Sequence, residues 1–207
     1  PLAKDAAFAK SLDFNGAVRV TDYSTSGTVW TWKAGATYEP IDGLTLRVTR
    51  SRDIRAPNLN ELYSSYVLTF SAITDPVTGR QSTVRSPQQG NLGLKPEKAD
   101  TFTAGVVYEP SFAPRLRMSV DYYDIDLKGA ISTLTGQQIV NRCAAGSTDL
   151  CSYITRNSDG SLAEVMRTFI NLSSIQMRGV DTEISYRTPM SEIFEAVDGD
   201  LTLRLLA

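Results

Sequence analysis

The sequence predicts an all-β chain, folded as an antiparallel up-and-down segment of a transmembrane β-barrel with about seven strands and long extracellular loops. Three observations support this prediction. Apolar and polar residues alternate with a period of two along several segments. The connections between these segments are alternately short and long. Tyr and Trp recur where an apolar strand face meets a turn, as aromatic residues do at membrane interfaces.

Each strand is assigned from alternating apolar positions, because successive side chains of a strand point to opposite faces of a sheet. The expected strands lie at residues 18–21, 28–39, 44–49, 101–109, 116–121, 180–187 and 201–205. Helix is expected only in the connections, as a short helix at 134–142 and one or two turns at 191–197.

The lengths of the connections indicate a meander. Residues 40–43 and 110–114 form short turns, whereas residues 54–98 and 128–174 form long connections. Residues 24–27 make a tight hairpin on the side of the long connections, and 188–200 a medium one on the opposite side. In a meander every second turn lies at the same end of the sheet, so nearly all of the loop mass gathers at one end.

Composition excludes several classes of function. The chain of 207 residues has no histidine, which excludes histidine-based triads, HExxH zinc sites and His/Cys zinc fingers. A formal net charge of -2 gives no electrostatic basis for nucleic-acid binding. No segment has the roughly 18 consecutive apolar residues of a membrane-spanning helix. We expect the protein to have no enzymatic activity, no cofactor and no metal site.

The two faces of the expected strands have opposite chemistry. Trp32, Val48, Val106, Val120 and Ile184 lie on the apolar side, which we expect to contact hydrocarbon. In a soluble β-sandwich the same side would pack on a second sheet, and alternation by itself leaves this interpretation open. Membrane-interface positions are predicted for the aromatic residues Trp30, Trp32, Tyr38, Tyr108 and Tyr186.

The polar side is interpreted either as a solvated, mutually paired wall or as the lining of a barrel lumen, where opposite charges on neighbouring strands stabilise the pairing. The residues predicted to face the lumen are Arg19, Lys33, Arg47, Arg117, Asp121, Asp181, Glu183 and Arg204. Arg50 and Arg52 instead share the parity of the apolar side above Val48. They are either free surface arginines or contacts for lipopolysaccharide phosphates.

Cys143 and Cys151 lie within one long connection. A metal site with two cysteines and no histidine is poor, whereas a disulfide suits an oxidising exterior. We therefore predict a disulfide, which stabilises the chain by roughly 2 to 3 kcal/mol if it closes this short loop.

Three segments resemble the TonB-dependent receptors of Gram-negative outer membranes. Residues 55–63 read Arg-Ala-Pro-Asn-Leu-Asn-Glu-Leu-Tyr after a strand, residues 91–97 read Asn-Leu-Gly-Leu-Lys-Pro-Glu before the next, and residues 178–183 read Arg-Gly-Val-Asp-Thr-Glu. The resemblance implies a barrel of about 22 strands with an N-terminal plug. Residues 1–207 would be part of this single barrel domain, with the plug domain and the terminal strands absent.

The resemblance also implies a function. The complete protein would lie in the bacterial outer membrane, bind a scarce nutrient and import it with energy from TonB. A ferric siderophore is the expected nutrient and an oligosaccharide the next choice. Expected partners are TonB, through the missing N-terminal part, and outer-membrane lipid and lipopolysaccharide. The alternatives are a soluble all-β carbohydrate-binding module and a passive porin.

Candidate ligand-binding residues lie in the long connections. Arg55, Asn58, Glu61 and Tyr63 either fold the loop locally, which we favour, or contact ligand near the barrel mouth. The side chains of Tyr66, Tyr153 and Asn157 are also suited to a sugar or a siderophore, since aromatic and amide groups bind both.

Overall fold

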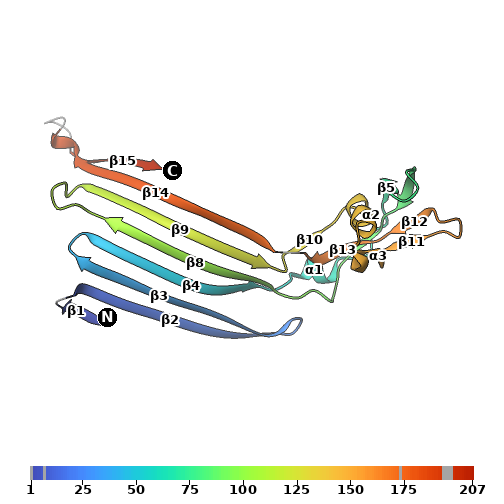
Figure 1. The fold of residues 1–207 in the computed structure, drawn as a ribbon, viewed down its shortest axis with the longest axis horizontal. Helices are drawn as coiled ribbons and strands as arrows, with labels where there is room; N and C mark the ends of the chain where they lie inside the picture. Colours follow the sequence, from blue (N-terminus) through green and yellow to red (C-terminus); the bar gives the residue numbers. More distant parts are fainter. Residues whose placement is uncertain (1, 7, 173, 193–197) are drawn as a thin grey trace.

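A computed structural model describes residues 2–6, 8–172, 174–192 and 198–207, and its largest element is one antiparallel sheet of eight strands (Figure 1). Spatial neighbours are also neighbours in chain order within this sheet, as in a meander. Its strands are β1 (Ala3–Ala6), β2 (Ala9–Tyr23), β3 (Gly27–Ile41), β4 (Leu44–Arg55), β8 (Glu97–Tyr108), β9 (Leu116–Lys128), β14 (Ile175–Pro189) and β15 (Asp200–Leu206).

The seven expected strands are confirmed as β2, β3, β4, β8, β9, β14 and β15. Strand β1 was not predicted, because its sequence Ala-Lys-Asp-Ala has no alternation of apolar side chains. Several strands are also longer than expected. Strand β9, for example, continues to Lys128, since backbone pairing with its neighbours persists after the apolar alternation has stopped.

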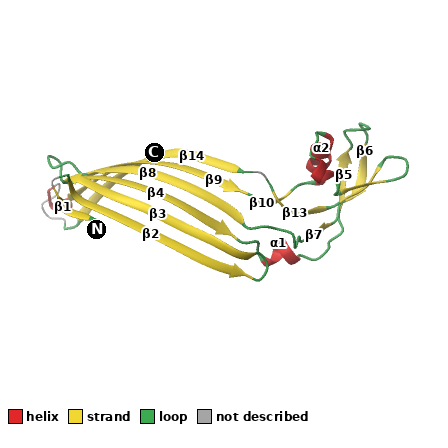
Figure 2. Ribbon diagram, turned by 60° about the horizontal axis from the view of Figure 1, so that its bottom comes forward, coloured by secondary structure: helices red, strands yellow, loops and turns green. Residues whose placement is uncertain are grey.

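One face of the large sheet is apolar and open. Pairing places Val48 opposite Ala104, Ala104 opposite Tyr122 and Tyr122 opposite Val180, so these side chains share a face. Val48 and Val120 on this face are 41% and 47% exposed. No second layer of the described residues covers the face, as Figure 2 also shows, and the β-sandwich interpretation is therefore wrong.

The two long connections fold together into one unit at a single end of the sheet, which we call the outer module (residues 56–96 and 129–172; Figures 1 and 2). Its helices are α1 (Leu59–Tyr63), α2 (Gly136–Ala144) and α3 (Thr148–Cys151). Its strands are β5 (Phe70–Thr74), β6 (Gln81–Arg85), β7 (Gln88–Gln89), β10 (Ile131–Thr133), β11 (Ile154–Arg156), β12 (Leu162–Val165) and β13 (Arg167–Asn171). Parallel pairing of β12 with β6 and of β13 with β7 joins the two connections.

The outer module has a small hydrophobic core of its own. Ile73 and Val84 from the first connection pack with Ile139, Val140 and Val165 from the second, and each of these side chains is at most 3% exposed. This shared core makes each long connection depend on the other for burial of its apolar groups.

Helix α2 confirms the expected helix, two residues later in the sequence than predicted. Its start is set by a capping box, in which Thr135 and Gln138 accept each other's backbone N–H groups. A disulfide between Cys143 and Cys151, with Cα atoms 5.0 Å apart, joins α2 to α3. Of the turns expected at 191–197, the structure shows a 3-10 turn at Met190–Glu192, and residues 193–197 lie outside the described residues.

None of the helices in the described ranges combines the length and apolarity that crossing a bilayer requires.

An ion pair joins the two connections at the far end of the module. Arg156 donates to both carboxylate oxygens of Asp75, at 2.6 and 3.0 Å, and the backbone N–H of Val77 donates to the same carboxylate. The Asp75 side chain is only 5% exposed. The hydrogen bonds from Arg156 lower the pKa of Asp75 to about 2, although burial opposes this shift.

This pair makes the outer module sensitive to acid. The pKa of Asp75 is lower in the folded protein than its ordinary value of 3.8, so the carboxylate stabilises the module above about pH 4. That contribution is lost as the pH falls towards 2. We expect amide hydrogen exchange in β5 and β11 of the full-length protein, corrected for intrinsic rates, to accelerate over this range.

The variant Asp75→Asn should show faster exchange in β5 and β11 already at pH 6, with little further change down to pH 2. Asp149→Asn, an exposed substitution in α3, is the matched control and should respond to pH as the wild type does. Equal acid sensitivity of Asp75→Asn and wild type would contradict the assignment.

Candidate functional site

The face of the large sheet opposite the apolar one is rich in charged residues, and we call it the charged face. Register places Arg47 opposite Gly105, Gly105 opposite Asp121 and Asp121 opposite Asp181, so these residues share it. All of the residues predicted to face the lumen lie on this face: Arg19, Lys33, Arg47, Arg117, Asp121, Asp181, Glu183 and Arg204.

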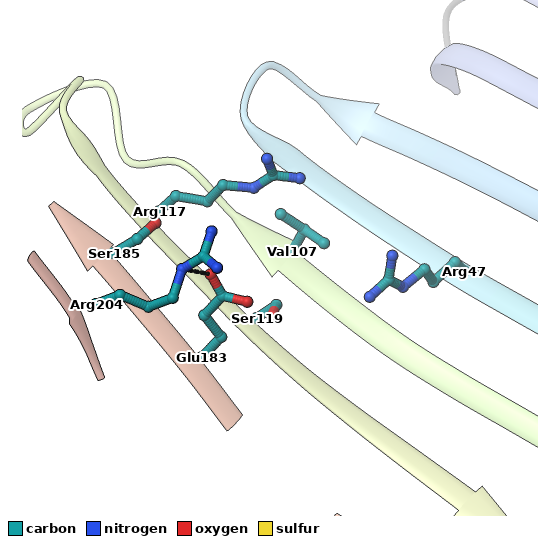
Figure 3. Close-up of a pocket in the computed structure, with 7 residues that line it drawn as sticks. All are labelled: Arg47, Val107, Arg117, Ser119, Glu183, Ser185 and Arg204. Atoms are coloured by element: carbon teal, nitrogen blue, oxygen red, sulfur yellow. Dashed lines mark ion pairs between the residues drawn. The ribbon is translucent and has the colours of Figure 1, made fainter. Parts of the chain in front are cut away.

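A hollow of about 270 Å³ lies on the charged face, and Figure 3 shows the side chains around it. Its lining comes from strands β4, β8, β9, β14 and β15, namely Arg47, Val107, Arg117, Ser119, Glu183, Ser185 and Arg204. Arg204 forms an ion pair with Glu183 at 2.9 Å, while Arg117 lies 3.3 Å from Glu109. Arg47 pairs with Asp121, so each of the three arginines that line the hollow is balanced by a carboxylate.

A second hollow of about 510 Å³ adjoins the first and shares Arg47, Ser119 and Glu183 with it. Asp121 and Asp181 also line it, so negative groups predominate there. The charged face thus carries basic and acidic side chains that form ion pairs within a strand pair or across one strand. No cluster of His, Cys, Asp or Glu in the described ranges is arranged to hold a metal ion.

A glycine on β8 leaves room for an ion pair between its two neighbouring strands, β4 and β9. The guanidinium of Arg47 on β4 donates two hydrogen bonds to the carboxylate of Asp121 on β9, at 2.9 and 2.5 Å. Both side chains pass over Gly105, which separates them in the sheet. A Cβ atom at position 105 would lie 1.9 Å from Oδ1 of Asp121, so a larger residue would displace this carboxylate.

The predicted interface aromatics lie on the apolar face near the ends of the strands. Trp30 and Trp32, opposite Val20 and Val18, are near the loop end, and Trp30 is 60% exposed. The other three are near the tight turns, with Tyr108 and Tyr186 36% and 40% exposed. The hydroxyl of Tyr38 donates to the carbonyl of Phe8, so this tyrosine is bonded within the protein.

Arg55, Asn58 and Glu61 meet in a polar network at the base of the outer module. Arg55 donates to Glu97 at 2.6 and 2.8 Å and to both carboxylate oxygens of Glu61 at 3.1 Å. Glu61 and Asn58 also form a capping box that starts α1. Glu61 and Glu97 are both 8% exposed, and a buried carboxylate requires such partners.

This network also reaches the second long connection, because Glu97 accepts the backbone N–H of Ile131 at 2.6 Å. Nearby, the side chain of Asn171 bonds to both backbone groups of Lys95 and to the carbonyl of Gly129. Sequence reasoning did not identify the roles of Glu97 and Asn171. The segments 55–63 and 91–97 thus hold the outer module on the sheet, which supports the structural interpretation of these segments.

The other candidate ligand residues are dispersed through the module. Tyr63 at the end of α1 and Tyr66 just after it are 57% and 50% exposed. Tyr153 packs against the core of the module, and the amide of Asn157 donates to the hydroxyl of Ser161 within a hairpin turn. Their contact with a ligand stays a prediction.

Sequence reasoning missed two exposed apolar residues beside the tyrosines, Val67 at 56% and Leu68 at 43%. Together with Tyr63, Tyr66 and the 63% exposed Phe70 they form an apolar segment of the outer module. A run of apolar residues inside a polar connection was the available signal.

Comparison with known proteins agrees with this architecture. The family described as "TonB dependent receptor-like, beta-barrel" matches residues 4–207. No curated protein shows significant sequence similarity to the chain.

Three solved structures share the fold. The siderophore receptor PirA from Acinetobacter baumannii is 19% identical with a TM-score of 0.63, covering 87% of this chain and 24% of its own. PirA from Pseudomonas aeruginosa is 14% identical with a TM-score of 0.57, covering 95% of this chain and 31% of its own. The ferric enterobactin receptor PfeA from Pseudomonas aeruginosa, in complex with BCV-L6, is 19% identical with a TM-score of 0.60, covering 94% of this chain and 24% of its own.

At these identities the similarity concerns the fold alone. The chain spans about a quarter to a third of the length of these structures. The match of the family over nearly the whole chain, together with the single-layer sheet and its loops, leads to one conclusion: the chain belongs to the TonB-dependent receptors, a family of transport receptors, and forms part of their β-barrel.

Proposed function

We propose that this chain is part of an outer-membrane receptor that binds a ferric siderophore outside the cell and imports it with energy supplied by TonB. The proposal rests on membership of a family of transport receptors and on the described architecture. TonB and the plug would act through parts of the protein outside residues 1–207.

One observation carries the proposal: a single sheet separates two chemically opposite faces and carries a folded module at only one end (Figure 2). An exposed apolar face suits lipid, since contact with water would be unfavourable over such an area. The charged face then lies inside the barrel, where its paired charges and hollows suit the polar surface of a plug. The outer module lies where a nutrient would arrive from outside.

The nutrient class is inferred from two sources. The solved structures of similar fold are a siderophore receptor and a ferric enterobactin receptor. In this chain the apolar segment with Tyr63, Tyr66 and Phe70 offers exposed aromatic rings, which stack on flat or apolar ligand groups. An oligosaccharide would also stack on these rings, so the experiment includes both ligand classes.

We expect the full-length receptor to restore growth of an iron-starved strain that lacks its own siderophore receptors, when ferric siderophores are supplied. Deletion of the TonB gene should abolish uptake and leave surface binding of the radiolabelled chelate intact. Uptake that persists without TonB would indicate a passive porin. If the receptor imports oligosaccharides but no ferric chelate, the siderophore is rejected as the nutrient, and the proposed role as an importing receptor is retained.

A second prediction concerns the glycine under the cross-strand ion pair. In the full-length receptor, Gly105→Ala should displace the Asp121 carboxylate and lower stability by about 0.5 to 1 kcal/mol, the usual contribution of a partly exposed pair. Guanidinium unfolding of the receptor in detergent measures this change. Gly16→Ala is the matched control, because a Cβ there meets Phe14 and the Lys33 carbonyl at ordinary distances of 3.6 and 3.9 Å.

A double-mutant cycle isolates the cause of that change. When Asp121→Ala is already present, Gly105→Ala should cost less, since no carboxylate remains to be displaced. An equal cost in both backgrounds would show that the substitution acts through the backbone, and would reject the role assigned to Gly105.

A third prediction separates ligand contact from folding of the outer module. Tyr66→Ala should weaken binding of the ferric siderophore by about two- to tenfold, since loss of one stacked ring costs about 0.5 to 1.5 kcal/mol. Exchange protection of the module should be unchanged. Arg55→Ala should instead lower both siderophore affinity and exchange protection of the module, because it leaves Glu61 and Glu97 buried without their partner. If Arg55→Ala weakens binding while the module stays fully protected, Arg55 is a ligand residue.

A further inference from the structure

The two faces of the large sheet exchange their chemistry near the loop end. Along β9 the apolar residues lie on the apolar face as far as Tyr122, whereas Ile125 and Leu127 lie on the charged face. Strand β14 shows the same exchange, because Ile175 and Met177 also lie on the charged face. The apolar side chains therefore change sides at the same level of both strands.

Strand pairing gathers these side chains into one surface inside the barrel wall. Ile125 lies opposite Met177, and Leu127 lies opposite Ile175. Ile175 and Met177 are 49% and 50% exposed, so the described part of the outer module leaves them open. We call this surface the mouth patch, and it consists of Tyr123, Ile125, Leu127, Ile175 and Met177.

A glycine extends the mouth patch over β14. Tyr123 lies opposite Gly179, and a Cβ atom at position 179 would lie 2.4 Å from the Oη atom of Tyr123 and 2.5 Å from its Cζ atom. The tyrosine ring therefore lies across the glycine, and a larger residue at this position would displace it. This contact gives Gly179, which belongs to the segment 178–183 singled out in the sequence, a structural role.

Charged side chains of the same face surround the mouth patch without entering it. On the side of the tight turns, Asp121 and Asp181 begin the region of paired charges. On the side of the outer module, Arg55 binds Glu97. Among the described residues, the charges near the level of the patch lie on β2, β3 and β4, namely Arg19, Lys33 and Asp53. Strand β8, with Ala99, Thr101 and Thr103 on this face, separates them from the patch.

Contact with lipid does not account for the mouth patch. The sheet contacts lipid with its other face, and at the level of the patch that face carries Asp124, Asp126 and Arg178. The mouth patch instead faces the lumen, between the outer module and the paired charges. An exposed group of apolar side chains in such a place is typical of a binding surface.

From this arrangement we infer that the mouth patch binds a hydrocarbon chain of the imported ligand, which is an uncharged ferric chelate. This inference rests on the proposed function, which makes the patch part of the path from the outer module into the lumen. A chain that packs on Ile125, Ile175 and Met177 leaves water, and this transfer is favourable. A chelate with surplus negative charge would lose hydration beside the patch without gaining a partner there.

The test uses the full-length receptor in detergent and two ferric chelates of desferrioxamine B, one carrying an acetyl group on its amine and the other an octanoyl group. Both chelates are uncharged, and they differ only in the length of the hydrocarbon chain. We expect the wild type to bind the octanoyl chelate roughly tenfold more tightly, because burial of about two methylene groups has this effect. Equal affinity for the two chelates, or binding of neither, would overturn the inference.

A double variant assigns the preference to the mouth patch. Ile125→Thr with Met177→Thr removes two apolar side chains and introduces a residue that favours strands. This variant should bind both chelates with the affinity that the wild type has for the acetyl chelate. A preference that persists in the double variant would place the chain elsewhere and overturn the inference.

The matched control is Val77→Thr, which changes a valine that is 72% exposed at the far end of the outer module. This variant should keep the roughly tenfold preference for the octanoyl chelate. Misfolding would weaken binding of both chelates alike, and heat-modifiable gel mobility checks that the barrel of each variant has folded.

A thiol probe distinguishes the ligand from the plug as the partner of the mouth patch. A maleimide should label Met177→Cys in the ligand-free full-length receptor, and the octanoyl chelate should slow this labelling more than the acetyl chelate does. The wild type measures labelling of thiols elsewhere in the protein. Absence of labelling at position 177 in the ligand-free receptor would show that the plug or another segment covers the patch, which would overturn the inference.

Failure of this inference is distinguishable from failure of the proposed function. A receptor that imports ferric siderophores with TonB but has no preference for the octanoyl chelate would refute only the role of the mouth patch. Absence of TonB-dependent uptake of any ferric chelate by the wild type would reject the proposed function itself.

Discussion

Two residues that face each other across an antiparallel ladder point to the same side of the sheet, and the remaining features of this structure depend on that constraint. It carries the chemistry of each strand to the next, so that Val48 and Val180, on strands separated by two others, share one surface. It also places Arg47 and Asp121 on the other surface, where Gly105 leaves room for them to meet. One continuous sheet therefore has an apolar face on one side and a charged face on the other.

The outer module follows a different physical rule. The two long connections bury their apolar residues in one shared core, where Ile73 and Val84 meet Ile139 and Val165. The module remains attached to the sheet through buried carboxylates, because Glu61 and Glu97 need the Arg55 guanidinium once water is excluded. Folding of the outer module is therefore coupled to pairing of the strand ends that carry Arg55 and Glu97. The two long connections therefore form one folded unit and not two separate loops.

The loop ends of the strands, where the apolar surface gives way to charged residues, join these two parts. Strands β4, β8, β9 and β14 continue past the last apolar row, and next to the outer module they carry charged residues on the same face, such as Arg52, Lys98, Lys128 and Arg178. Such an extension keeps the backbone hydrogen bonds of the strand satisfied where the surroundings change from lipid to headgroups and water. The same strand thus spans three environments without interruption of the ladder.

The sequence by itself determined the seven main strands, their order, the two faces and the end at which the loops gather, because a period of two and a turn are local signals. It also predicted helix α2 to within two residues. Only the tertiary structure decided that Glu97 and Asn171 anchor the module, that the two connections share a core, and that Arg50, Asp124 and Arg178 lie in one row. These contacts join residues far apart in the chain, and their geometry depends on strand register and side-chain packing. A local pattern carries no information about either.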